Sequence, residues 1–287
     1  MSEQAGVAVV TGASRGAGRG IAIALGSHGC TVYVTGRSEK AGDSPLPGTI
    51  FQTADAVTAA GGIGIPVRVD HTDMAQIEAL FVRVEEEQGR LDILVNNAFA
   101  AHGQLLSPAP FWEKPLDMVN MLDAGLKGAY AACYYAAPLL AKQDRGLVAF
   151  TSASGATHYV FGPVYGVHKA GLDKFAADMA VDFRDFNVAS VSIWMGTVLT
   201  ERIQVMAQAD PERFEKLKEN METPEFTGHV IWALYSDPDV MELSGRAVIG
   251  ADMAVTYGIT DDGGRQPQSY RELHGVEPFR QYQRIIR

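Results

Sequence analysis

The sequence predicts a single α/β domain, a doubly wound (Rossmann) fold in which a seven-stranded parallel sheet carries helices on both faces. Two observations predict it. Short apolar runs of the kind buried in parallel sheets alternate along the chain with segments of helical periodicity. A glycine-rich turn joins the first apolar run to the first helical segment. The chain has 287 residues, enough for such a domain, and no linker divides it.

The first strand and the turn after it predict a nucleotide site. The apolar run Val7–Val10 leads into TGASRGAG at 11–18, and a helical segment begins at Arg19. A strand, a glycine-rich turn and a helix start together bind pyrophosphate, because backbone N–H groups and the helix dipole face the anion. The turn residues that we expect to contact a dinucleotide are Gly12, Ser14, Arg15, Gly16 and Gly18.

The end of the second strand predicts which dinucleotide is bound. The strand Thr31–Thr35 continues into Gly36-Arg37-Ser38, and no acid occurs before Glu39. In this fold an acid at that place selects NAD, whereas an arginine accommodates the 2′-phosphate of NADP. Arg37, with Arg15 approaching from the turn, therefore favours NADP(H), and NAD(H) is the less favoured alternative.

A tyrosine and a lysine on one predicted helix, with a serine after the preceding strand, form a candidate catalytic group. Tyr165 and Lys169 are four residues apart on a predicted helix, so they share one face. The lysine ammonium favours the phenolate and lowers the tyrosine pKa from its ordinary value of about 10. Ser152, thirteen residues before Tyr165, follows the strand Leu147–Phe150 and can hydrogen-bond a substrate oxygen. We expect Ser152, Tyr165 and Lys169 to be catalytic, with Tyr165 as general acid or base.

These motifs, in this order, resemble the short-chain dehydrogenase/reductase family over about residues 5–255. The resemblance implies that Asp70 bonds the adenine amino group, that Asn97 lies beside the cofactor, and that Thr200 contacts the nicotinamide carboxamide. It also implies that Tyr165 contacts the cofactor and that Lys169 holds the ribose hydroxyls. The stretches 89–98, 111–113 and 125–128 are similar to the member 1 branch of the family, which is poorly defined in substrate.

The chain departs from the family pattern at three positions. Phe99 replaces the glycine of the NNAG stretch, and Met195 replaces the proline of a Pro-Gly pair. The family's asparagine, whose side chain holds a water that relays protons to the lysine, is Gly125 here, or Ala124 if the alignment slips by one. We expect a water in the space that this side chain would fill, held by the carbonyl of residue 125 and reaching Lys169. On that expectation, Gly125→Asn changes turnover little.

Other segments are expected to shape the site. The domain should span residues 1–260, with a helical lid over the substrate at about 197–222, and residues 261–287 should form a C-terminal extension, with a subunit contact as one role. The aromatics of 99–115 either line the substrate cavity or pack against the next helix. His158 and His168 flank the catalytic stretch, and we expect local hydrogen bonds to satisfy them.

Composition excludes several classes of function. A net charge of −10 without a lysine or arginine cluster argues against nucleic acid as a partner. The apolar run Ala129–Leu140 is too short to span a membrane, and the polar N-terminus does not resemble a signal peptide. Cys30 and Cys133 indicate neither a disulfide framework nor zinc, so we expect no metal. The expected location is cytoplasmic.

The resemblance also implies assembly as a homotetramer or homodimer. The segments Leu116–Gln143 and Tyr165–Phe186 would pack against their counterparts in another subunit. Alanines between 129 and 137, with tyrosines among them, predict a surface suited to close helix packing, although the sheet must bury one face of the same helix.

The function predicted from the sequence is an NADP(H)-dependent carbonyl reductase or alcohol dehydrogenase that acts on a small carbonyl or alcohol substrate. Two alternatives stay open from the residues alone. One is an NADP-retaining lyase or epimerase on the same scaffold. The other is a cofactor-binding regulatory protein that lost turnover along with the asparagine.

Overall fold

A computed structural model of the chain describes residues 6–209, 211–218, 220–282 and 284–286. Within them, one sheet has the strand order β3-β2-β1-β4-β5-β6-β7, with all neighbours parallel. The predicted doubly wound α/β fold is confirmed. The strands are β1 Val7–Val10, β2 Thr31–Gly36, β3 Ile63–Arg68, β4 Ile93–Asn96, β5 Gly146–Ser152, β6 Val188–Trp194 and β7 Ala247–Ile249.

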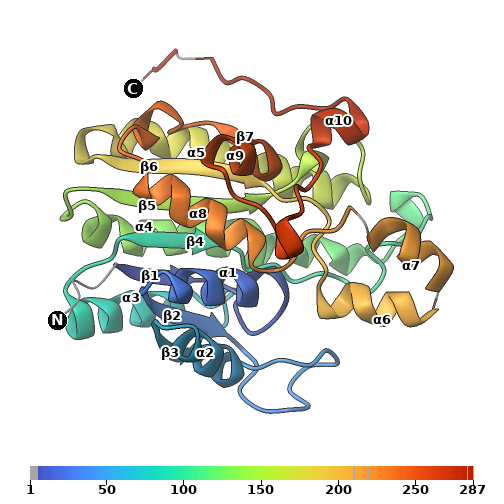
Figure 1. The fold of residues 1–287 in the computed structure, drawn as a ribbon, viewed down its shortest axis with the longest axis horizontal. Coiled ribbons are helices and arrows are strands. Elements are labelled where there is room, and N and C mark those ends of the chain that lie inside the picture. The colour runs from blue at the N-terminus through green and yellow to red at the C-terminus, as the bar shows by residue number, and fades with distance from the viewer. Residues whose placement is uncertain (1–5, 210, 219, 283, 287) are drawn as a thin grey trace.

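Helices cover both faces of the sheet (Figure 1). Successive side chains of a strand point to opposite faces, so Ala8 and Val10 of β1 enter one buried core, and Val7 and Val9 enter the other. The first core is closed by α1 Gly16–Ser27, α2 Ile50–Ala59, α8 Phe226–Ser236 and α9 Gly250–Tyr257. The second is closed by α3 Met74–Gln88, α4 Gly128–Leu140 and α5 Pro163–Phe183.

The segment Leu116–Gln143 is not one continuous helix. A 3₁₀ turn spans Leu116–Asn120, a π-helical turn spans Asp123–Lys127, and α4 begins only at Gly128. Gly125 in the π turn and Gly128 at the start of α4 both lie against neighbouring elements. A Cβ added at Gly125 would lie 2.4 Å from the His168 ring, and one at Gly128 would lie 2.2 Å from the His71 carbonyl oxygen. Close contacts with neighbouring elements set the backbone conformation of this segment, and the helical periodicity of the sequence does not reveal those contacts.

The surface expected for subunit packing on α4 is only partly available. Ala129, Ala131, Ala132 and Ala136 are buried in the core of this chain, whereas Tyr130 and Tyr134 are exposed. The expectation that the alanines form an outer surface is therefore wrong, because the sheet buries that face of the helix. The exposed face of α4 carries the tyrosines.

Segments beyond the strands complete the molecule. The region 197–222 contains α6 Glu201–Ala209 and α7 Pro211–Lys218, which Figure 1 shows set apart from both helix layers at one end of the sheet. After α9, the chain forms a 3₁₀ turn at Asp262–Gly264 and a short helix, α10 Tyr270–His274. No helix in the described part of the chain is long and apolar enough to cross a membrane.

Candidate active site

The candidate site lies where the strand order reverses, between β1 and β4. Register pairs Val10 with Val95, and Ser152 with Trp194, so the carboxyl ends of β1, β4, β5 and β6 meet at one edge of the sheet. In open α/β sheets such a reversal forms the ligand-binding crevice. The residues predicted for cofactor and for catalysis follow these strand ends.

The glycine turn is held in place from β4. Gly12 has φ +65°, and a Cβ there would lie 2.7 Å from the Ala98 Cα. A Cβ at Gly18 would lie 2.4 Å from Asn97 Nδ2, the atom that donates to the carbonyls of Thr11 at 2.9 Å and Gly12 at 3.2 Å. The Asn97 amide nitrogen is therefore used to fix the turn that the sequence predicts for pyrophosphate.

An anionic group already lies at the start of α1. The Glu201 carboxylate, from the first turn of α6, accepts a hydrogen bond of 2.8 Å from the Gly16 N–H. Thr200 lies beside it, with its Cγ2 3.4 Å from where a Gly16 Cβ would be. A helix N-terminus that binds a carboxylate in this way also suits a phosphate, so the residues present fit the phosphate group of a dinucleotide.

The two arginines predicted to favour NADP(H), Arg15 in the glycine turn and Arg37 after β2, differ in their contacts. Arg15 donates to the carbonyls of Pro47 at 3.0 Å and Gly48 at 2.8 Å, and to Ser38 Oγ at 2.8 Å, so it fixes the loop after β2. The Arg37 side chain is 62% exposed, and its Nη1 lies 3.6 Å from Asp70 Oδ2. Arg37 is thus accessible at the position predicted to meet the adenosine ribose. Ser14 is buried under the same turn.

The three predicted catalytic residues lie together between β5 and α5. Ser152 Oγ donates to the Lys169 carbonyl at 3.2 Å, and Lys169 Nζ donates to the Thr151 carbonyl at 3.0 Å. The ammonium lies 5.6 Å from the centre of the Tyr165 ring. Ser152 and Lys169 are buried, whereas Tyr165 keeps partial access to solvent.

Burial decides the protonation of this group. Desolvation raises the pKa of the Tyr165 phenol, with a smaller contribution from Tyr270. Desolvation lowers the pKa of Lys169 to about 8, and the negative charge of Asp173 opposes that change. We expected the ammonium to lower the tyrosine pKa, whereas desolvation of the phenolate raises it. The phenol therefore holds its proton at neutral pH.

Sequence reasoning missed Asp173, one turn beyond Lys169 on α5. Its carboxylate accepts hydrogen bonds from Ser192 Oγ at 2.6 Å and from Trp194 Nε1 at 2.9 Å. It therefore ties α5 to β6 beside the lysine. The spacing 165, 169 and 173 places all three on one helix face, and that spacing could have indicated Asp173 from the sequence.

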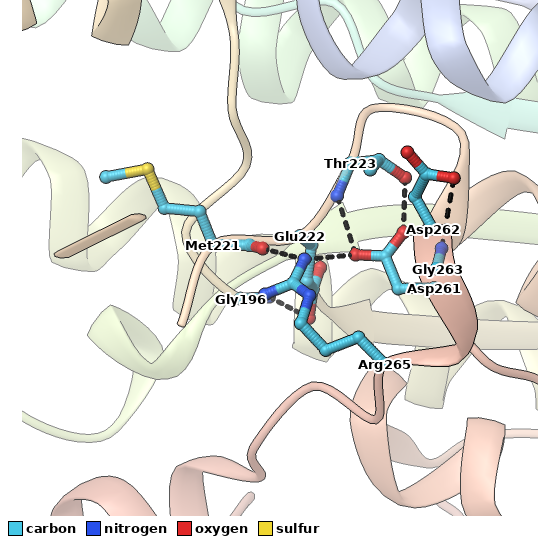
Figure 2. A network of polar contacts seen from close by, with 8 residues as sticks. All are labelled: Gly196, Met221, Glu222, Thr223, Asp261, Asp262, Gly263 and Arg265. Atoms are coloured by element: carbon cyan, nitrogen blue, oxygen red, sulfur yellow. Dashed lines mark hydrogen bonds and ion pairs between the residues drawn. The ribbon is translucent and has the colours of Figure 1, made fainter. Parts of the chain in front are cut away.

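A second missed group joins the end of β6 to the C-terminal extension. Glu222 Oε1 accepts a hydrogen bond of 2.9 Å from the Gly196 N–H, as Figure 2 shows. The Thr223 N–H donates to Asp261 Oδ2 at 2.9 Å, and Arg265 pairs with the same carboxylate at 2.6 Å. Desolvation raises the pKa of Glu222 to about 7. The extension thus fixes the segment that follows the predicted lid.

An apolar wall packs against Tyr165. Leu105, Met118 and Met121 are buried together, with Phe99 packed against them. Phe111 and Trp112 pack against each other with ring centres 5.2 Å apart and are exposed, so neither joins this wall. Tyr270 of the extension belongs to a separate cluster, with its ring 6.2 Å from that of Trp194.

The expectations for Gly125 and His168 are wrong. The His168 ring, buried and stacked on Phe99 at 4.8 Å, fills the space that a side chain at 125 would occupy, so the expected water cannot lie there. Neither ring nitrogen has a hydrogen-bond partner among the described residues, although local bonds were expected. A Gly125→Asn variant would meet this ring and is not a mild change. His158 Nδ1 is likewise buried without a partner in the described chain.

Known proteins resemble this chain over most of its length. The family model for short chain dehydrogenases matches residues 6–211. Dehydrogenase/reductase SDR family member 1 of Homo sapiens is 38% identical over 281 residues, which cover 94% of this chain and 87% of that protein. The Mus musculus protein of the same name is 39% identical over 278 residues, covering 93% and 86%.

Solved structures share the fold. A short chain dehydrogenase from Mycobacterium thermoresistibile superposes with a TM-score of 0.77 at 24% identity, covering 93% of this chain and 92% of that one. A putative dehydrogenase from Xanthomonas campestris gives 0.78 at 23% identity, covering 93% and 95%. With the sequence matches, these place the chain in the short-chain dehydrogenase/reductase family, whose members are oxidoreductases that use a nicotinamide cofactor.

Proposed function

We propose that this protein is an NADP(H)-dependent carbonyl reductase or alcohol dehydrogenase that acts on a small, largely apolar substrate. The observation that carries the proposal is the dry group of Tyr165, Lys169 and Ser152, which lies beside an apolar wall and near a helix start that accepts an anion. A protonated phenol next to a buried ammonium is suited to donate a proton to a carbonyl oxygen.

The chain's own residues supply the proton chemistry. When bound, the nicotinamide supplies a hydride to the substrate carbon, or accepts one in the reverse direction. Tyr165 donates its phenolic proton to the substrate oxygen during reduction, and Lys169 stabilises the phenolate left behind. Ser152 orients the substrate oxygen, for which its hydroxyl must turn away from the Lys169 carbonyl. The apolar residues around Phe99 exclude water from this step.

Cofactor preference is proposed from the end of β2. Arg37 is exposed there, and Arg15 lies close enough for each charge to act on the other. Two positive charges favour the 2′-phosphate of NADP(H) over the bare ribose of NAD(H). Asp70 is near enough to pair with Arg37 and would hold the guanidinium beside the adenosine.

Two further parts of the proposal concern the lid and assembly. We propose that α6 and α7 close over the substrate, since they stand beyond the strand ends and Glu201 contacts the glycine turn. We propose a homotetramer or homodimer that uses the exposed face of α4, where Tyr130 and Tyr134 are 54% and 66% exposed. A monomer mass in light scattering would contradict the assembly.

A turnover assay tests the activity. The purified protein is incubated with NADPH and a panel of apolar aldehydes and ketones, and loss of NADPH absorbance is followed. Net oxidation of NADPH is the expected result. Substrate conversion without net cofactor change would favour a lyase or epimerase, and cofactor binding without any conversion would favour a regulatory protein.

A further inference from the structure

His168 is a buried polar residue that the proposed chemistry does not yet use. Its side chain lies one residue before Lys169 on α5 and is 1% exposed. Neither ring nitrogen has a hydrogen-bond partner in the described part of the chain. The Gly125 backbone raises the pKa of the ring, a smaller contribution than the opposite ones of burial and Lys169. Buried donors and acceptors left in this state are costly and usually find a partner, often an ordered water.

The position of the ring is specified by two residues that depart from the family pattern. Gly125 lacks a side chain, and a Cβ there would lie 2.4 Å from His168 Cδ2 and Nε2. Phe99 stacks on the imidazole with ring centres 4.8 Å apart and an interplanar angle of 22°. A glycine on the π turn and an aromatic after β4 therefore form a slot that fits one imidazole.

The same phenylalanine lies beside the catalytic cation. Lys169 Nζ is 5.5 Å from the centre of the Phe99 ring, and the Tyr165 ring centre is 6.2 Å from it. An ammonium has three donors, and among the described residues Thr151 accepts one of them. The His168 imidazole and the Lys169 ammonium thus lie at the same ring, that of Phe99. Both have hydrogen-bonding groups without a partner among the described residues.

The state of the imidazole suits an acceptor. Burial, then the charge of Lys169, lower the pKa of His168 to about 2, so the ring is neutral and offers one acceptor nitrogen and one N–H. The charged or titratable groups that face this region are Lys169, Asp173 and Tyr165. With the ring neutral, His168 does not compete with Lys169 for a proton.

We propose that His168 is a positioning residue for Lys169, its neutral imidazole binding the ammonium through one buried water and so keeping the lysine protonated and in place. The contact itself does not depend on catalysis. Its effect on turnover rests on the proposed reductase function, because it acts through the lysine that supports Tyr165.

The first experiment measures Lys169 directly in the free protein. The pKa of Lys169 is followed through its ¹³Cε chemical shift, assigned with Lys169→Met. His168→Leu removes the acceptor, and the lysine pKa should fall by about 0.5–1, the effect of losing one hydrogen bond to the charged form. His168→Asn retains an acceptor and should keep the wild-type value. Asp173→Asn is the positive control, since losing that charge should also lower the lysine pKa.

The second experiment tests the slot. Gly125→Asn should lower the melting temperature, because it meets the ring, and should cost much less in a His168→Ala background. Gly103→Asn is the matched control, since a Cβ there meets nothing within 4 Å and its cost should not depend on residue 168. Equal costs of Gly125→Asn in both backgrounds would show that the ring does not fill this space.

Turnover provides the third measurement. If the wild-type enzyme is active, His168→Leu should lower kcat and leave KM little changed. The fall in the Lys169 pKa should also appear as an acidic shift in the pH profile of kcat. His168→Asn should keep kcat and the pH profile at their wild-type values. An unchanged lysine pKa in a folded His168→Leu protein overturns the inference. Wild-type protein that reduces no carbonyl contradicts the proposed function instead, and the chemical-shift result still decides the role of His168.

Discussion

The two halves of the site are built differently. The cofactor half, formed by the glycine turn and the ends of β1 and β2, presents an exposed charge at Arg37. The substrate half, formed by β5, β6, α5 and the C-terminal extension, is dry, and residues such as Glu222 and Asp261 come from distant segments. Charge specifies the first half, and burial sets the chemistry of the second.

The largest expected effect comes from removing the general acid of the substrate half. Tyr165→Phe should lower turnover by about 10²–10⁴-fold, because the general acid is lost. Cofactor affinity should stay near the wild-type value, since the ring still packs against Phe99 and the charges at β2 are untouched. Steady-state kinetics and cofactor titration measure the two halves separately. A comparable fall in cofactor affinity would mean that the halves are not independent.

Next in size is the effect of pH on Glu222. Its folded-state pKa of about 7 lies above the ordinary 4.5, so the native protein binds this proton more tightly than the unfolded chain does. The contribution of Glu222 to stability is therefore fully present below about pH 4.5 and is lost as pH rises through about 7. The loss amounts to about 3 kcal/mol.

Glu222→Gln cannot titrate, so it should not lose stability across this window. Denaturant midpoints at about pH 5 and about pH 8 should differ less for the variant than for the wild type. Glu78→Gln, on the exposed surface of α3, is the matched control and should follow the wild type. If both proteins show the same pH dependence, Glu222 is not the buried acid that the network in Figure 2 implies.

The comparison explains how far the sequence could predict the molecule. Strand periodicity and the turn at 11–18 indicated the fold, because burial in a parallel sheet leaves a local pattern. Tyr165 and Lys169 followed from a spacing along one helix, and Ser152 from its place after a predicted strand. The role of His168 could not be predicted, because its surroundings depend on the π turn Asp123–Lys127. The role of Glu222 could not be predicted either, because its neighbours meet only after folding. The direction of the Tyr165 pKa was missed for the same reason, since burial decides it.

A change in the cofactor half should alter cofactor affinity and leave turnover near the wild-type value. Arg37→Asp should reverse the preference for NADPH over NADH. NADPH affinity should fall by about 10- to 100-fold, because a charge-assisted hydrogen bond is lost and a repulsive charge is added, and NADH affinity should rise by about 10- to 100-fold. Turnover at saturating NADH should stay near that of the wild type. Arg68→Asp makes the same charge change at the end of β3 and is the control. No change in preference would remove the argument for NADP(H).

The smallest predicted effect concerns the contact that joins the halves. Glu201 of α6 accepts a hydrogen bond from the Gly16 N–H, at the helix start expected to bind phosphate. Both groups are anionic and need the same donor, so they compete. Glu201→Gln should therefore tighten NADPH binding by about 3- to 10-fold, the effect of weakening one hydrogen bond to a charged group. Glu215→Gln, exposed on α7, tests for a general effect of charge and should leave affinity unchanged.

Fluorescence titration decides between two roles for Glu201. Tighter binding means that Glu201 competes with the phosphate for the Gly16 N–H, whereas weaker binding means that Glu201 helps α6 to hold the cofactor.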